Sequence, residues 1–234
     1  MSTFLQLVQR FRQETNYADT GPADVTAQTG DHQRAVDWVA SAYTELQNRH
    51  RWRWLKKGFT LSTSGSDGEY AFGDATDTAT ASAITRFRSW DVKDRYDPPR
   101  IYLTSAGIGS EGILSYVACE DFKMMYRIGT RIEGYPAHIS VDPNNNIQLG
   151  PIPDAAYTIT SEYHMSPQIL AADATVPELP VQFHMLLVYR AMEDIGYFDV
   201  AQEIIERSRV KGRRLLRQLE NDQLEPIRMA GAMV

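Results

Sequence analysis

Several stretches of this sequence have residue types and spacings that could support chemistry. Residues 107–112 read G-I-G-S-E-G, which matches the glycine pattern of dinucleotide-binding turns. That function also requires a long helix after the glycines and an acidic residue at the end of the next strand. The residues that follow, I-L-S-Y-V-A-C, introduce neither. We therefore interpret residues 107–112 as a flexible turn.

The histidines and the single cysteine lack the spacings of metal or catalytic sites. The chain has no H-E-x-x-H, no paired Cys/His motif, no Walker A segment and no G-x-S-x-G elbow. Cys119 has no histidine close to it in sequence, so a buried inert thiol is the simpler interpretation. A hydrolase that uses Glu111, Glu120 or His138 is an alternative, because only the folded chain can bring such groups together. The sequence predicts a protein that is not an enzyme and has no metal or cofactor.

The composition is that of an ordinary soluble globular protein. Of 234 residues, 43% are hydrophobic and 23% charged, and the formal net charge is -6. This charge argues against a protein whose whole surface binds nucleic acid. No run approaches the roughly 18 apolar residues of a membrane span, and the first residues lack the features of a secretory signal. We expect a protein made in a cytoplasm that does not associate with membranes.

The two ends of the chain have helical periodicity. Residues 3–14 and residues 35–48 each carry an apolar stripe. A further helix is expected to begin at Pro180, with an apolar stripe that starts at Val181. Asp199 and Gln202 have the spacing of a capping box that would start the last helix. The stripe of the last helix contains Ala201, Ile205, Ser208, Gly212, Leu215 and Leu219. The small residues Ser208 and Gly212 predict a helix-pairing position where a partner backbone comes close.

Between these helices the period changes to two. Residues 59–63 and 70–72 are expected to form a hairpin, with Asp67 and Gly68 at its turn. Residues 84–92 and 157–163 alternate as strands, and residues 137–141 and 147–149 flank a second turn. A brief helix within residues 115–128 is expected to point Phe122, Met125 and Tyr126 inward.

This pattern predicts an α+β fold in which the N- and C-terminal helices form one bundle and the strands form an insertion. The predicted helical bundle is discontinuous and comprises residues 1–57 and 178–224. The β-rich insertion comprises residues 58–177. Residues 225–234 are apolar and too short to fold alone, so we interpret them as a docking tail.

The last helix carries a run of cations opposite its apolar stripe. They are Arg207, Arg209, Lys211, Arg213, Arg214 and Arg217. Such a run is either a solvated face, a docking surface for an acidic partner, or a nucleic-acid-binding face. Val210, an apolar residue among these charges, favours docking. A second possible nucleic-acid signal is the alternation of aromatics and bases around Trp52 and Trp54. We interpret these two tryptophans as anchors between a helix and the first strand.

Three groups of segments are distinctive together: residues 36–47 with Trp52 and Trp54, residues 150–157 with 163–167, and residues 179–184 with 189–191. In this order they resemble the head–tail adaptor, or connector, proteins of tailed bacteriophages. The resemblance covers about residues 4–224. It implies a structural protein of the virion, located in the tail or neck and present in the host cytoplasm during assembly.

The resemblance also implies partners. These are the portal protein, a ring of twelve copies of the chain, and the next tail component, of the nozzle or tail-terminator type. Double-stranded DNA would pass through the ring without sequence-specific binding. The family's portal contacts would fall on Arg209, Arg213, Arg214, Arg217, Ile227, Arg228 and Met229. A closed ring needs two different faces on each subunit, and Trp38, which lies off the main stripe of its helix, is a candidate for the lateral contact.

Overall fold

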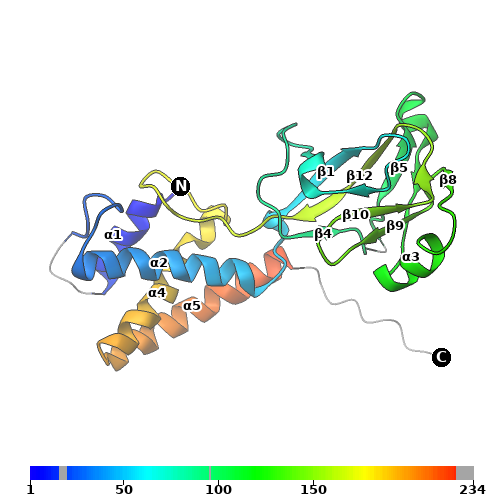
Figure 1. Cartoon of the computed structure of the whole chain (residues 1–234). Helices are drawn as coiled ribbons and strands as arrows, with labels where there is room; N and C mark the ends of the chain where they lie inside the picture. The colour runs from blue at the N-terminus through cyan, green and yellow to red at the C-terminus, as the bar shows by residue number, and fades with distance from the viewer. Residues whose placement is uncertain (16–19, 95, 225–234) are drawn as a thin grey trace, which may run out of the picture. The chain divides into compact units, whose positions relative to one another are not determined.

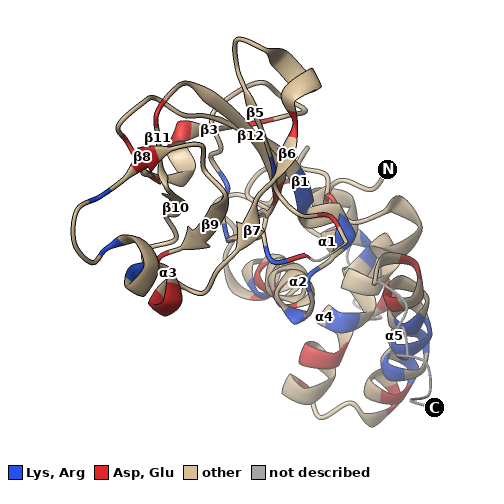
Figure 2. Cartoon of the chain, turned by 90° about the vertical axis from the view of Figure 1, so that its right-hand side faces the viewer, with Lys and Arg blue, Asp and Glu red and all other residues tan. Residues whose placement is uncertain are grey.

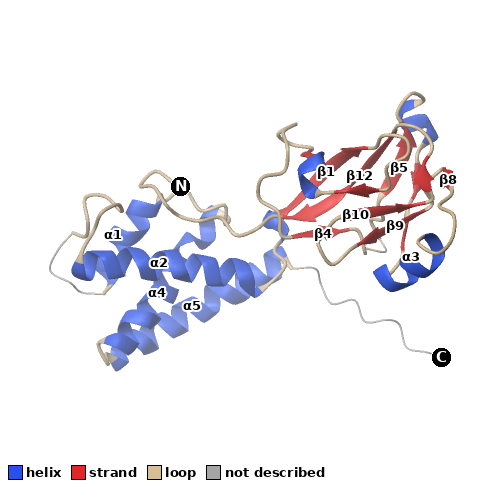
Figure 3. Cartoon of the chain, in the orientation of Figure 1, coloured by secondary structure: helices blue, strands red, loops and turns tan. Residues whose placement is uncertain are grey.

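The computed structural model describes residues 1–15, 20–94 and 96–224. The chain divides into two compact units, Met1–Trp54 with Pro167–Val234, and Leu55–Ser166. We call them the helical unit and the β unit (Figure 3). Helices from both ends of the chain flank a strand-rich middle, which confirms the predicted α+β class. Residues 167–177, assigned to the insertion on sequence grounds, belong to the helical unit, and residues 55–57 belong to the β unit.

The helical unit contains four long helices (Figure 1). They are α1 (Phe4–Glu14), α2 (Gly30–Arg49), α4 (His184–Phe198) and α5 (Gln202–Gln223). The start of α1 is fixed by a capping box, because Thr3 and Gln6 exchange hydrogen bonds between side chain and backbone. Helix α4 contacts each of the other three helices. Its buried side chains therefore form the centre of the helical core.

Two predicted details of α4 and α5 are wrong. Pro180 is followed by the 3₁₀ turn η4 (Val181–Phe183), α4 begins only at His184, and Val181 is exposed. Asp199 ends α4 and does not cap α5, whose N-cap is Ala201. Val200 between the two helices has a φ of 55°. A residue in this left-handed conformation ends a helix without a side-chain cap.

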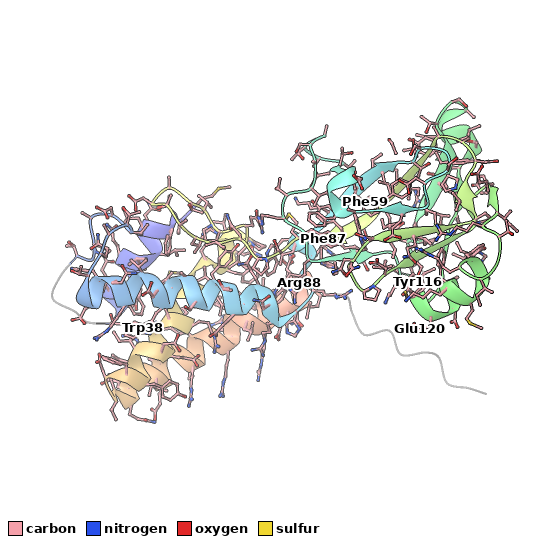
Figure 4. All side chains as sticks on the ribbon, viewed as in Figure 1. Trp38, Phe59, Phe87, Arg88, Tyr116 and Glu120 are labelled. Atoms are coloured by element: carbon pink, nitrogen blue, oxygen red, sulfur yellow. The ribbon has the colours of Figure 1, made fainter. Side chains whose placement is uncertain are left out.

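The β unit is built around β12 (Tyr157–His164), which pairs with three other strands. The six-stranded sheet has the order β3-β1-β12-β5-β6, and β4 also pairs with β12. Its other strands are β1 (Lys56–Ser62), β3 (Ala75–Asp77), β4 (Ser89–Asp91), β5 (Arg100–Leu103) and β6 (Gly112–Ile113). Aromatic rings from β1, from β4 and from the loop before β4 pack together, and the ring centroids of Phe59 and Phe87 each lie 4.6 Å from that of Trp90. Figure 4 labels Phe59 and Phe87.

The second sheet of the β unit has four strands in the order β2-β10-β9-β7. They are β2 (Glu69–Tyr70), β7 (Ser115–Tyr116), β9 (His138–Val141) and β10 (Ile147–Gly150). The short helix α3 (Cys119–Tyr126) packs on β9. A separate parallel pair joins β8 (Glu133–Gly134) to β11 (Ile152–Pro153). Short 3₁₀ turns complete the chain: η1 (Arg53–Leu55), η2 (Phe72–Asp74) and η3 (Gly107–Ser110).

Of the two hairpins predicted from the sequence, one is confirmed and the other is wrong. The hairpin of β9 and β10 and the strand β12 are confirmed. The hairpin predicted for residues 59–72 does not form, because β1 pairs with β12 and β3 while β2 pairs with β10 in the other sheet. Of residues 84–92 only β4 is a strand. Phe122 is buried as predicted, whereas Met125 is 54% exposed.

Candidate interaction surfaces

Helix α5 presents a compact basic patch on its exposed side. Its buried stripe contains Ile205, Ser208, Gly212 and Leu219. Arg213 and Arg217 are one turn apart, and Val210 and Arg214 are likewise one turn apart, so the four side chains share the opposite surface. We call Val210, Arg213, Arg214 and Arg217 the α5 patch. Val210, at the N-terminal end of the patch, is 73% exposed, and Figure 2 shows the basic residues of α5.

The cations of α5 fall into two groups. Arg207 reaches the Glu14 carboxylate at 3.1 Å. The Arg209 guanidinium lies 5.4 Å from the ring centroid of Tyr197, and the Lys211 ammonium lies 5.4 Å from that of Tyr189. These three are therefore engaged within the subunit. Within residues 1–15, 20–94 and 96–224, the structure gives Arg213, Arg214 and Arg217 no ion pair and leaves them exposed.

The small residues of α5 lie in its contact with α4. Ser208 is fully buried, and a Cβ atom at Gly212 would lie 3.5 Å from Cβ of Tyr189 on α4. This distance is an ordinary van der Waals contact. Gly212 therefore lies in the contact between the two helices, but the helices are not at their closest approach there.

Two other predicted interaction residues are placed differently. Trp38 on α2 is half-buried between Phe11 and Phe198, with centroid distances of 6.1 and 5.8 Å (Figure 4). Part of its surface is thus already used within the subunit. The predicted tail residues Ile227, Arg228 and Met229 lie outside the described residues.

The Trp52–Trp54 pair is a structural anchor. Trp52 is fully buried, and its Nε1 donates a 2.6 Å hydrogen bond to the carbonyl oxygen of Leu46. Its ring stacks on Trp54 at a centroid distance of 4.7 Å. A buried ring already stacked on its neighbour is not available to a nucleic-acid base. These contacts tie the pair to α2 within the helical unit, and the predicted link to the first strand stays a prediction.

The acidic residues and the histidine considered for hydrolysis lie on different elements of the β unit. His138 Nδ1 lies 2.6 Å from the hydroxyl of Tyr126. Glu120 is at the start of α3 (Figure 4), and Glu111 follows η3 on the surface. Among the residues that the structure describes, no three His, Cys, Asp or Glu side chains are grouped as metal ligands. The glycines at 107–112 form η3 and the start of β6, and no long helix follows them.

A cluster of four ionisable side chains, which the sequence did not reveal, joins three strands of the β unit. Lys56 of β1 lies 3.0 Å from Asp91 of β4 and also pairs with Glu162 of β12. His164 Nε2 lies 3.6 Å from the same Asp91 carboxylate. The contacts with His164 and then Lys56 lower the pKa of Asp91 to about 2, against the opposing effect of burial. Burial opposes the charged form of Lys56, but its bonds to Glu162 and Asp91 raise its pKa.

Comparison with known proteins identifies the class of this chain. The family described as SU10 adaptor protein matches residues 2–230. The chain therefore belongs to the SU10 adaptor protein family, which is a family of phage adaptor proteins. No curated protein matches it significantly.

Membership of this family indicates a structural, virion-associated protein rather than an enzyme. Within the described ranges of the chain, no helix combines the length and the apolar character needed to cross a membrane.

Proposed function

We propose that this adaptor binds the portal protein of its phage as a twelve-membered ring, in the tail or neck of the virion. The ring extends the DNA channel and provides the platform for the next tail component. The observation that supports the portal contact is the α5 patch, in which an exposed valine lies next to three exposed arginines that have no ion pair with any residue the structure describes. Exposed cations beside an exposed apolar side chain suit a protein interface, where charge sets partner and orientation and the apolar group is desolvated.

The overall charge supports a conduit for DNA. Affinity for DNA increases with the number of phosphates that a protein neutralises. A subunit with a formal net charge of -6 repels the phosphate backbone overall, so DNA can slide through a ring of such subunits. The cations of the α5 patch then bind the acidic surface of a protein partner. The alternative function, a nucleic-acid-binding module that uses Arg207–Arg217, predicts instead a salt-dependent affinity for DNA.

A binding measurement with the full chain and the purified portal tests the α5 patch. Reversing Arg213, Arg214 and Arg217 together to glutamate should weaken portal binding by at least about tenfold, because each lost cation also becomes a like charge. A matched control reverses three exposed cations elsewhere, Arg51, Arg53 and Arg88, and should bind within about twofold of the wild type. Equal losses of portal affinity in both variants would mean that net charge alone explains the effect, which would contradict the proposal.

The tail and the lateral contact are tested separately. Deleting residues 225–234 should weaken portal binding if Ile227, Arg228 and Met229 contact the portal, and unchanged binding would refute that assignment alone. Replacing Trp38 with alanine should reduce ring formation on the portal if this side chain contacts a neighbouring copy. Because Trp38 also packs on Phe11 and Phe198, the melting temperature of the Trp38→Ala variant must be measured in parallel. A variant that is destabilised but assembles normally would refute the lateral contact.

A further inference from the structure

The four-stranded sheet of the β unit carries a row of polar side chains. Gln148 of β10 lies directly opposite Glu69 of β2 on one side and Ser140 of β9 on the other. Directly paired residues on adjacent antiparallel strands point to the same face of a sheet. Ile147 and Leu149 alternate with Gln148 and occupy the opposite face. The polar face is the one near α3, since His138, two residues before Ser140, bonds to Tyr126 of that helix.

Two members of this row carry unpaired atoms. Gln148 is 4% exposed and Ser140 is fully buried. In the part of the chain that the structure describes, Oε1 of Gln148 and Oγ of Ser140 have no hydrogen-bond partner. A buried polar atom without a partner lowers the stability of the folded chain. Each unsatisfied polar group in a native protein therefore calls for an explanation, and we consider whether a ligand supplies the missing partner of Gln148.

Gln148 lines a hollow of about 730 Å³ beside α3. One part of its wall is apolar and consists of Met124, Ile128 and Pro143, of which Met124 is 70% and Ile128 66% exposed. The polar part contains Gln148 and a second carboxamide, Asn144. Methionine side chains adapt to the shape of a partner, and they are frequent at surfaces that bind polypeptides.

The charges around the hollow nearly cancel. Arg127 and Glu69 form an ion pair at 2.8 Å. Asp142 accepts hydrogen bonds from the backbone amides of Asn144 and Asn146 at 2.8 and 2.7 Å. The other charged residues that line the hollow are Glu120 and Lys123, which have opposite signs. Neither a phosphate nor a strongly charged segment has a complementary field here.

We propose that this hollow binds an extended polypeptide segment with neutral, apolar side chains. Peptide groups project sideways from an extended chain. Each one has a donor and an acceptor, which match the carboxamides of Gln148 and Asn144. The apolar side chains of the segment contact Met124 and Ile128. This inference rests on the proposed function, in that the segment belongs to the tail protein that attaches to the adaptor.

Titration calorimetry of the full-length adaptor with short overlapping peptides from the phage's tail proteins tests this site. A neutral, apolar peptide should bind, and Met124→Glu should weaken its binding by at least about tenfold by placing a charge on the apolar wall. Ile108→Glu is the matched control, because Ile108 is also 70% exposed in the β unit but does not line the hollow. Binding that is unaffected by Met124→Glu, binding of strongly charged peptides alone, or no binding would overturn the proposal.

The role of Gln148 is tested with Gln148→Leu, which replaces the carboxamide by an apolar group of similar size. If the carboxamide serves the ligand, this variant should bind the peptide about tenfold more weakly while its melting temperature stays the same or rises. Loss of folding, or a lower melting temperature with unchanged binding, would give Gln148 a purely structural role and contradict the proposal.

Assembly of particles separates this inference from the proposed function. Met124→Glu adaptors should join the portal as the wild type does, but the resulting particles should lack the next tail component. Normal tails on these particles would refute the docking site alone. If the wild-type adaptor itself failed to join the portal, the proposed function would fail.

Discussion

A Cβ atom at Gly196 of α4 would lie 2.6 Å from Cγ1 of Ile205 on α5. No real Cβ atom approaches a neighbour so closely, and Ile205 is only 5% exposed, so it has little room to move. The absence of a side chain at Gly196 thus lets α5 approach α4 next to the turn that joins them. This contact fixes the orientation in which α5 presents its basic patch.

Gly196→Ala should therefore destabilise the chain by about 1–3 kcal/mol, because overpacking outweighs the better helix propensity of alanine. Urea denaturation followed by circular dichroism measures the change. Gly212→Ala is the control, since the nearest atom to its new Cβ would be 3.5 Å away. That variant should be neutral or up to about 1 kcal/mol more stable. Equal effects of the two substitutions would contradict this account of the helix pair.

The cluster of Lys56, Asp91, Glu162 and His164 predicts acid sensitivity of the β unit. The pKa of Asp91 is about 2, below its ordinary value. A lowered folded-state pKa contributes stability that is present above the unfolded-state pKa of about 4 and is lost as the pH falls from about 4 to about 2. For this shift the contribution is about 2 kcal/mol. Asp91→Asn should remove it at pH 7 and flatten the stability profile below pH 4. An unchanged profile would show that the cluster does not hold the strands.

The same substitution to phenylalanine should change the stability of the chain differently at Trp52 and at Trp54. Trp52→Phe removes the donor to the Leu46 carbonyl from a fully buried site and should cost about 1–3 kcal/mol. Nε1 of Trp54 is buried and has no partner among the described residues. Trp54→Phe should therefore be neutral or stabilising. Chemical denaturation of both variants checks this difference.

The same tryptophans bear on the nucleic-acid alternative. Because Trp52 is buried against Trp54, single-stranded DNA should not quench the fluorescence of this pair at physiological salt. Quenching with a steep salt dependence would favour a nucleic-acid-binding module instead.

Several local signals in the sequence predicted the structure correctly, although the expected hairpin at residues 59–72 and the expected helix starts at Pro180 and Asp199 were wrong. The buried side of α1 and the stripe of α5 from Ile205 to Leu219 follow from a period of 3.6 residues. The hairpin of β9 and β10 follows from turn residues between two short apolar runs. The exposed position of Arg213, Arg214 and Arg217 opposite that stripe also follows from helical geometry alone.

Features that depend on distant pairings were not predictable. Alternation shows that residues 59–63 form a strand, but it does not show that β1 pairs with β12, whose residues lie far along the chain. Gln148 and Ser140 alternate with apolar residues as solvent-facing positions do, so their burial beside α3 is visible only in the fold. The same holds for Asp91, whose partners come from two other strands.

If this chain works by fitting other virion proteins as a ring on the portal, the purified chain mixed with its portal should show the ring by cryo-electron microscopy. An added ring of adaptor density should surround an open channel, with the α5 patch at the contact. Portals that remain bare at every ratio and ionic strength would refute the portal ring.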